Sequence, residues 1–317
     1  MTAPTVPPGS PAPPPAAAPS APSARQIAMA RRRRALTTFW REYRQDTGGM
    51  TGLVILVVLV IIALAAPLLA SSRGLSATLA TYPANAGPGW HYPLGTDADG
   101  RSVLTSLIWG SRISLLIGFT ATILSMVIGA VIGIVSGHFG KIIDNLLMRV
   151  TDWFLVVPFL PLAIVLAKTL GPSLGVIIFV IGVTSWPGTA RIIRAQALAV
   201  ETRPYLERSR ALGAGHWHQM SKHVLPNVMP LLLANTILTV AGTILAETTL
   251  SFLGLGDPLR PSWGEMLNQA FFTGGGSAGN QLWLIAPGIA IIVVVMAFTL
   301  CGHALEAVLD PKLRERS

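Results

Sequence analysis

The stretch GLVILVVLVIIALAAPLLA, residues 52–70, contains no charged or hydrogen-bonding side chain. It lies in an uncharged run between Asp46 and Arg73. A helix needs about 20 apolar residues to cross the ~30 Å hydrocarbon core of a bilayer, and this run is long enough. It is also longer than the apolar core of a secretory signal, so we expect a retained membrane-spanning helix.

The composition of the whole chain agrees with a membrane location. Of the 317 residues, 51% are hydrophobic and only 12% are charged, and the mean hydropathy is +0.59. Soluble domains carry roughly 25% charged residues, about twice this share. The single cysteine, Cys301, lies in an apolar run and can form no disulfide within the chain. The composition therefore predicts an integral membrane protein.

Five further runs of low charge have the length of membrane helices. They lie at residues 113–137, 146–168, 174–190, 227–250 and 282–303. Six spans place both termini on the same side of the membrane. The expected fold class is an all-α integral membrane protein with six transmembrane helices.

The distribution of Lys and Arg predicts the orientation of these spans. If the N-terminus is cytoplasmic, the segments on that side hold 18 of the 23 basic residues. Cytoplasmic loops are enriched in Lys and Arg, so we expect both termini inside the cell. The net charge of +9 is not gathered in a basic groove with interleaved aromatic residues, and we expect no nucleic-acid partner.

The order of these features suggests four segments along the chain. Residues 1–35 are rich in Pro and Ala and are predicted to form a disordered, basic cytoplasmic tail. Residues 36–112 are expected to hold the first transmembrane helix and an extracytoplasmic loop. Residues 113–309 are expected to form the main transmembrane domain, with five helices and a long cytoplasmic loop at 191–226. Residues 310–317 form a cytoplasmic C-terminal tail.

The second predicted span carries small residues at intervals of four. These are Ser125, Gly129, Gly133 and Gly137. Small residues at this spacing form one face of a helix and let another helix approach closely. We expect a helix-packing face, with the general tolerance of membrane helices for glycine as the alternative.

The sequence shows no catalytic, metal or cofactor site. It contains no phosphate-binding loop of the form G-x-x-x-x-G-K-[ST] and no H-E-x-x-H motif. His216 and His218 are two positions apart and point away from each other on a helix, and no thiol or carboxylate lies near enough to complete a tetrahedral site with them and His223. We therefore expect a non-catalytic chain without cofactor or metal.

Three ionisable residues in or near the spans are candidate functional groups, because charge is costly in hydrocarbon. Asp152 lies three residues after Arg149, and an ion pair between them is the expected arrangement. Glu247 has no cation near it in sequence. We expect it to make a hydrogen bond within the helix bundle, with a substrate contact as the alternative.

A polar stretch, YLERSRALGAGHWHQMSKHVLPN (residues 205–227), separates the fourth and fifth spans. Pro204 can begin a helix, and Gly213 lies where a left-handed C-terminal cap is needed. A second short helix is then expected from Trp217 to Val224, ended by Pro226. A connector between antiparallel spans needs only a few residues, so this helix, turn and helix are predicted to form a docking surface.

This stretch resembles the EAA loop of bacterial ATP-binding-cassette importers. The family pattern is E-A-A, three residues, G, and later a hydrophobic residue followed by L-P; Glu207, Gly213 and the run Val224–Pro226 match it in spacing. Arg208 and Ser209 stand where the family usually has two alanines. The resemblance implies that the ATPase-coupling residues are Tyr205, Leu206, Glu207, Arg208, Arg210, Ala211, Leu212, Gly213, Leu225 and Pro226.

Two other stretches narrow the resemblance. YPLGTDADGRSVLTSLIWGSRISL (residues 92–115) and LAETTLSFLGLGDPLRPSWGEML (residues 245–267) are similar to segments of the C-type permease subunit of dipeptide, oligopeptide or nickel importers, although Ser102 stands where aspartate is common. The resemblance implies a multi-pass subunit of the bacterial plasma membrane, surrounded by lipids, that forms half of the translocation pathway. It further implies a heterodimer with a homologous second permease subunit, two cytoplasmic ATPase subunits and an extracytoplasmic substrate-binding protein.

Other functions remain open from the sequence. A stand-alone secondary transporter could couple protons through Asp152 or Glu247, but such carriers often contain inverted repeats, and none is evident here. Nickel import in place of peptide import is a second alternative, within the same family. A membrane anchor or receptor without transport is a third.

Overall fold

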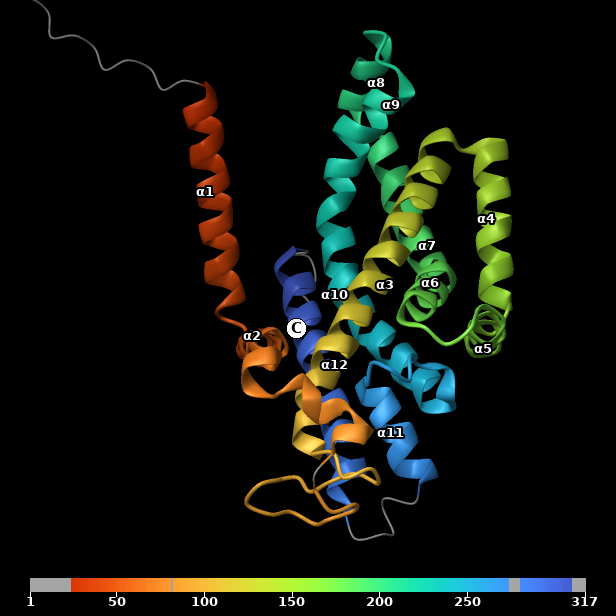
Figure 1. Ribbon diagram of the computed structural model, residues 1–317. Coiled ribbons are helices and arrows are strands. Elements are labelled where there is room, and N and C mark those ends of the chain that lie inside the picture. Colours follow the sequence, from red (N-terminus) through yellow and green to blue (C-terminus); the bar gives the residue numbers. More distant parts are fainter. Residues whose placement is uncertain (1–23, 81, 274–279, 310–317) are drawn as a thin grey trace, which may run out of the picture. The chain divides into compact units, whose positions relative to one another are not determined.

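The computed structural model describes residues 24–80, 82–273 and 280–309 (Figure 1). The chain divides into two units, residues 1–42 and 43–317. In the first unit the structure describes helix α1 (Ala24–Tyr43), which ends just beyond the unit boundary. The prediction of a disordered tail is therefore wrong for residues 24–35. This segment is rich in Ala and Arg, which have high helix propensity. The remainder of the predicted tail and the C-terminal tail at 310–317 lie outside the described residues.

The second unit is built from helices. They are α2 (Thr47–Leu69), α3 (Val103–Phe139), α4 (Lys141–Val156), α5 (Phe159–Leu170), α6 (Leu174–Thr184), α7 (Trp186–Glu201), α8 (Pro204–Ala211), α9 (His216–Gln219), α10 (Leu225–Leu250), α11 (Trp263–Phe272) and α12 (Leu282–Leu309). The described residues contain no β-strand. The prediction of an all-α membrane fold is confirmed.

Among the described residues, five stretches of helix are long and apolar enough to cross a membrane. They are Thr47–Leu69, Val103–Phe139, Leu174–Glu201, His216–Leu255 and Leu282–Val308. The span predicted at 146–168 is not one straight helix, because α4 and α5 meet at an angle of 88°. Pro158 explains the break: it restricts Val157 to an extended conformation, and Val157 has φ −71° and ψ 123°. The count of spans reaches six only if α4 and α5 together form one.

Helix α3 lies against α7 through its small residues. A Cβ added at Gly133 would lie 2.7 Å from the carbonyl oxygen of Ala190, and one at Gly137 would lie 2.7 Å from the Cβ of Ala197. Gly129 and Ser125, the other members of this row, are buried as well. The two backbones approach so closely that side chains at these positions would keep them apart.

An ion pair fastens α4 to α7 beside this contact. The guanidinium of Arg194 donates from Nε and Nη2 to the two carboxylate oxygens of Asp144, at 2.5 and 2.6 Å. Ser136 on α3 donates to the same carboxylate. A bidentate arrangement of this kind fixes orientation as well as distance, so α3, α4 and α7 are joined at one point.

The second unit has two ends, which we name by the helices that lie there. At the α11 end, the Trp263 backbone N–H donates to Ser114 Oγ near the start of α3 (3.1 Å). At the α8 end, His138 near the end of α3 lies 2.9 Å from His216 of α9, measured between the ring nitrogens Nε2 and Nδ1. Figure 1 shows α3 running between α11 and the pair α8 and α9. The long polar loops therefore lie at opposite ends of one helix.

The α3–α7 contact predicts the effect of a single methyl group. Gly133→Ala places a Cβ 2.7 Å from a carbonyl oxygen and is expected to destabilise the detergent-purified protein by ~1–3 kcal/mol. Gly242→Ala is the matched control, because no atom lies within 4 Å of its added Cβ. Thermal unfolding should show a lower midpoint for Gly133→Ala alone. Equal midpoints for the two variants would contradict close α3–α7 packing.

Candidate functional site

Helix α8 is a short helix with defined caps at both ends. Arg203 before it is extended (φ −80°, ψ 136°), and Pro204 occupies the first turn, where its missing N–H is not needed. After it, Gly213 has φ 82°. The N–H of Gly213 donates to Arg210 O (2.9 Å) and that of Ala214 to Ser209 O (3.1 Å), the pair of bonds of a Schellman motif. The sequence predicted the left-handed glycine for this reason.

The chain does not end its helix at Pro226, so this prediction is wrong. Helix α9 passes through a π-helical turn, Met220–Val224, directly into α10. In the π-helical turn the N–H of Leu225 donates to the carbonyl of Met220, five residues back. Because the wider turn changes the hydrogen-bond register, Pro226 is accommodated in the first turn of α10. The loop is thus a rigid extension of a membrane helix on one side.

The residues that the resemblance assigns to coupling lie mostly on the surface of this loop. Leu206 is fully buried and Leu225 is half-buried, whereas the other eight are exposed. Leu212 has 88% of its surface exposed, and the neighbouring Trp217 has 78%. Two large apolar side chains at the tip of a polar loop are typical of an interaction surface.

Two residues at the base of the loop, His138 and Glu201, were not predicted from the sequence. Glu201 lies at the end of α7 and contacts Nη2 of Arg210. The Nε of Arg210 also donates to Gln219 Oε1 (3.2 Å). Glu201 in turn contacts His138 of α3, with 2.6 Å between Oε1 and Nδ1. His138 and Glu201 are 63 positions apart, and no local pattern links them.

The expected ion pair between Arg149 and Asp152 is wrong. Asp152 instead accepts from Arg191 Nη2 of α7, at 2.5 Å. Both side chains of this pair are about half exposed. Arg149 is exposed and forms no ion pair with the described residues. The reason is tertiary: α7 brings a cation to α4 that is distant in sequence.

Glu247 makes the hydrogen bonds expected of it. Its side chain is fully buried and accepts from Ser114 Oγ (3.3 Å) and from Ser251 Oγ (2.8 Å). The bond from Ser114 joins α10 to α3 near the α11 end, and the bond from Ser251 lies within the helical stretch that continues α10. In this arrangement Glu247 holds the helix bundle together and has no surface for a substrate contact.

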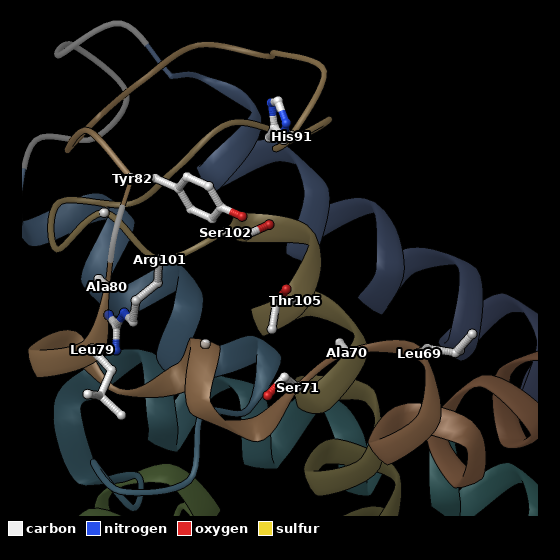
Figure 2. A pocket seen from close by; sticks show the side chains of 12 residues that line it. Leu69, Ala70, Ser71, Leu79, Ala80, Tyr82, His91, Arg101, Ser102 and Thr105 are labelled. Carbon is white, nitrogen blue, oxygen red and sulfur yellow. The ribbon is translucent and has the colours of Figure 1, made fainter.

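The α11 end contains a cavity of about 300 Å³ between the loop at 70–102 and the start of α3. Figure 2 shows the side chains that line it, including Tyr82, Arg101 and Ser102. Arg101 is held by Asp97 (2.5 Å) and by Gln269 of α11 (2.9 Å). Beside them, burial raises the pKa of the Glu265 carboxyl group, and a hydrogen bond from Gln269 opposes the shift. The cavity is therefore lined by apolar and polar residues together, and one of the polar side chains, Arg101, is held by two partners.

Within residues 24–80, 82–273 and 280–309, no three His, Cys, Asp or Glu side chains are arranged to hold a metal ion. The loop at the α8 end, with Leu212 and Trp217 exposed, has the form of an interaction surface.

Comparison with known proteins identifies the family. Residues 129–315 match the model of the "binding-protein-dependent transport system inner membrane component", and residues 36–88 match the "N-terminal TM domain of oligopeptide transport permease C". The chain is 35% identical to the dipeptide transport system permease protein DppC of Haemophilus influenzae over 88% of this chain and 96% of that protein. It is 36% identical to the DppC protein of Bacillus subtilis over 87% of this chain and 85% of that protein. The chain belongs to the family of binding-protein-dependent transport system inner membrane components.

Proposed function

We propose that this chain is the C-type permease subunit of an ATP-driven importer of dipeptides or oligopeptides. Family membership supports a transport role, and the names of the two DppC relatives favour peptides over nickel. A stand-alone proton-coupled carrier has less support, because Asp152 is paired with Arg191 and Glu247 is enclosed by hydroxyl groups. The chain would form half of the translocation pathway, in the bacterial plasma membrane.

The loop from α8 to the π-helical turn is proposed to dock on an ATPase subunit. The exposure of Leu212 and Trp217 is the observation that carries this proposal. Burying one such side chain against a partner stabilises a complex by ~1.5–3 kcal/mol. Glu207 and Arg208, exposed on α8, add charge to the surface. ATP binding and hydrolysis belong to the partner chains, two in number by family analogy.

The remaining partners follow from the same family. A homologous second permease subunit completes the pathway, and a substrate-binding protein delivers the peptide at the α11 end. Apolar side chains on α4, such as Ile142 and Val156, are about four-fifths exposed and would face lipid or the second subunit. The domain division after residue 112 is part of this proposal. So is the cytoplasmic position of the α8 end, which is supported by the 18 of 23 basic residues that lie in the segments assigned to that side.

The proposed orientation predicts cysteine accessibility. Thr78→Cys and Leu259→Cys, both exposed at the α11 end, should react with a membrane-impermeant maleimide added to intact cells. Lys222→Cys, exposed at the α8 end, should react only after the membrane is opened. The native Cys301 is buried and gives a low background. Labelling of Lys222→Cys from outside, with Thr78→Cys protected, would reverse the orientation.

The docking proposal predicts the loss of ATPase binding from two surface substitutions. Leu212→Ser and Trp217→Ser should each weaken retention of the ATPase subunits by ~2 kcal/mol, the cost typical of a residue central to an interface. Leu259→Ser is the matched control, since Leu259 is also 88% exposed but lies beside α11. Co-purification of the ATPases at equal membrane levels decides the matter. Retention that is unchanged in both loop variants would contradict docking through this surface.

The cap of α8 predicts a contrast between two glycines. An added Cβ meets no atom within 4 Å at Gly213 or at Gly215, but only Gly213 has a positive φ, of 82°. Gly213→Val should therefore strain the loop by ~1–2 kcal/mol and reduce peptide uptake. Gly215→Val, at φ −69°, should transport normally. Uptake assays at matched membrane levels test this, and normal uptake in Gly213→Val would show that the cap geometry is dispensable.

A further inference from the structure

Short segments of chain connect helix α8 to its neighbours α7 and α9. Only Thr202 and Arg203 separate it from α7. On its other side, Gly213 and Gly215 lie in the turn that leads to α9. Rotation about either link would change the angle of α8, so its orientation depends on side-chain contacts as well as on the backbone hydrogen bonds at its two ends.

One of these contacts joins α8 to the π-helical turn that precedes α10. Leu206 is fully buried, and Ser209 Oγ lies 3.4 Å from His223 Nε2. Neither side chain forms a hydrogen bond with the described residues of α3, so another contact is needed to carry a displacement of α8 to α3, the helix that runs to the α11 end.

Glu201 connects α8 to α3. One carboxylate oxygen, Oε1, lies 2.6 Å from His138 Nδ1, and the other, Oε2, contacts Arg210 Nη2. Both the Glu201 and His138 side chains are nearly enclosed, with 10% and 1% of their surfaces exposed. Bonds in which one partner is ionised are stronger than neutral ones, and shielding from water strengthens them further.

The contact extends on both sides of Glu201. His138 Nε2 lies 2.9 Å from His216 Nδ1, and the two rings pack against Phe139 with centroids about 5 Å apart. Arg210 also donates to Gln219 Oε1, and the Gln219 amide donates to the Ala214 carbonyl (2.6 Å). A carboxylate oxygen accepts, so Nδ1 of His138 carries a hydrogen and donates a hydrogen bond to Glu201 Oε1. The set joins α3, α7, α8 and α9.

We propose that Glu201 is a positioning residue that holds α8 at a fixed angle to α3, so that a displacement of the docked loop is passed to α3. This inference rests on the proposed docking of the loop on an ATPase. At its other end α3 holds Glu247 and the backbone of Trp263 through Ser114. Movement of α3 would therefore reach the α11 end without passing through the two-residue link at 202–203.

The test uses the assembled importer with Glu201→Ala, Glu201→Gln and Glu201→Asp. The measured quantity is the ratio of ATP hydrolysis with peptide-loaded binding protein to hydrolysis without it. Glu201→Ala removes both contacts and should lower this ratio about tenfold, or roughly 1.4 kcal/mol of coupling. Glu201→Gln keeps one acceptor oxygen, and Glu201→Asp keeps the charge. The hydrolysis ratio is expected to fall in the order wild type, Glu201→Asp, Glu201→Gln, Glu201→Ala. All four proteins should retain the ATPases.

Arg203→Gln is the matched control, since Arg203 is an exposed cation of the same loop whose side chain makes no hydrogen bond or ion pair with the described residues. It should keep the wild-type ratio. A wild-type ratio in Glu201→Ala would overturn the inference. It would also be overturned if Glu201→Ala lost bound ATPase to the same extent as it lost peptide uptake, because that result marks a docking or folding role. Failure of the proposed function is distinguishable, because the wild-type chain would then retain no ATPase at all.

Discussion

The close approach of α7 to α3 is the constraint on which the rest of the second unit depends. Lipid tails are as apolar as the helix surfaces, so membrane helices associate through tight packing and hydrogen bonds. Gly129, Gly133 and Gly137 remove the side chains that would separate the two backbones. This contact brings Glu201, the last residue of α7, beside the end of α3. The packing of α7 against α3 within the membrane therefore determines where the polar loop lies.

Hydrogen bonds between polar side chains also hold α3 against α10. Thr122 on α3 donates to Thr243 on α10 (3.0 Å), in the same interface where Glu247 accepts from Ser114. An unpaired polar group in hydrocarbon costs several kcal/mol, so each such pair resists separation of α3 from α10. Rigidity of this kind would let a displacement of the α8 end, as proposed, reach the opposite end of α3.

The sequence was sufficient for features that depend on local chemistry and insufficient for those that depend on distant partners. Apolar runs predicted the spans, and the position of Gly213 after a capped helix predicted its positive φ. The break at Pro158 had a signal in the proline itself, yet the 88° bend that follows was not predicted because a straight span also tolerates proline. The pairing of Asp152 with Arg191 and the contacts of Glu201 required α7 to be placed against α4 and α3, which no local pattern specifies.

In the proposed function, this chain transports peptide with energy supplied by ATPases docked at its α8 end. The most direct measurement is peptide uptake by proteoliposomes that contain the chain, its second permease subunit and the ATPases, with binding protein and labelled peptide supplied on the opposite side. The account predicts uptake that requires ATP on the ATPase side and persists when a protonophore removes the proton gradient. Uptake that continues without ATP and stops with the protonophore would contradict it.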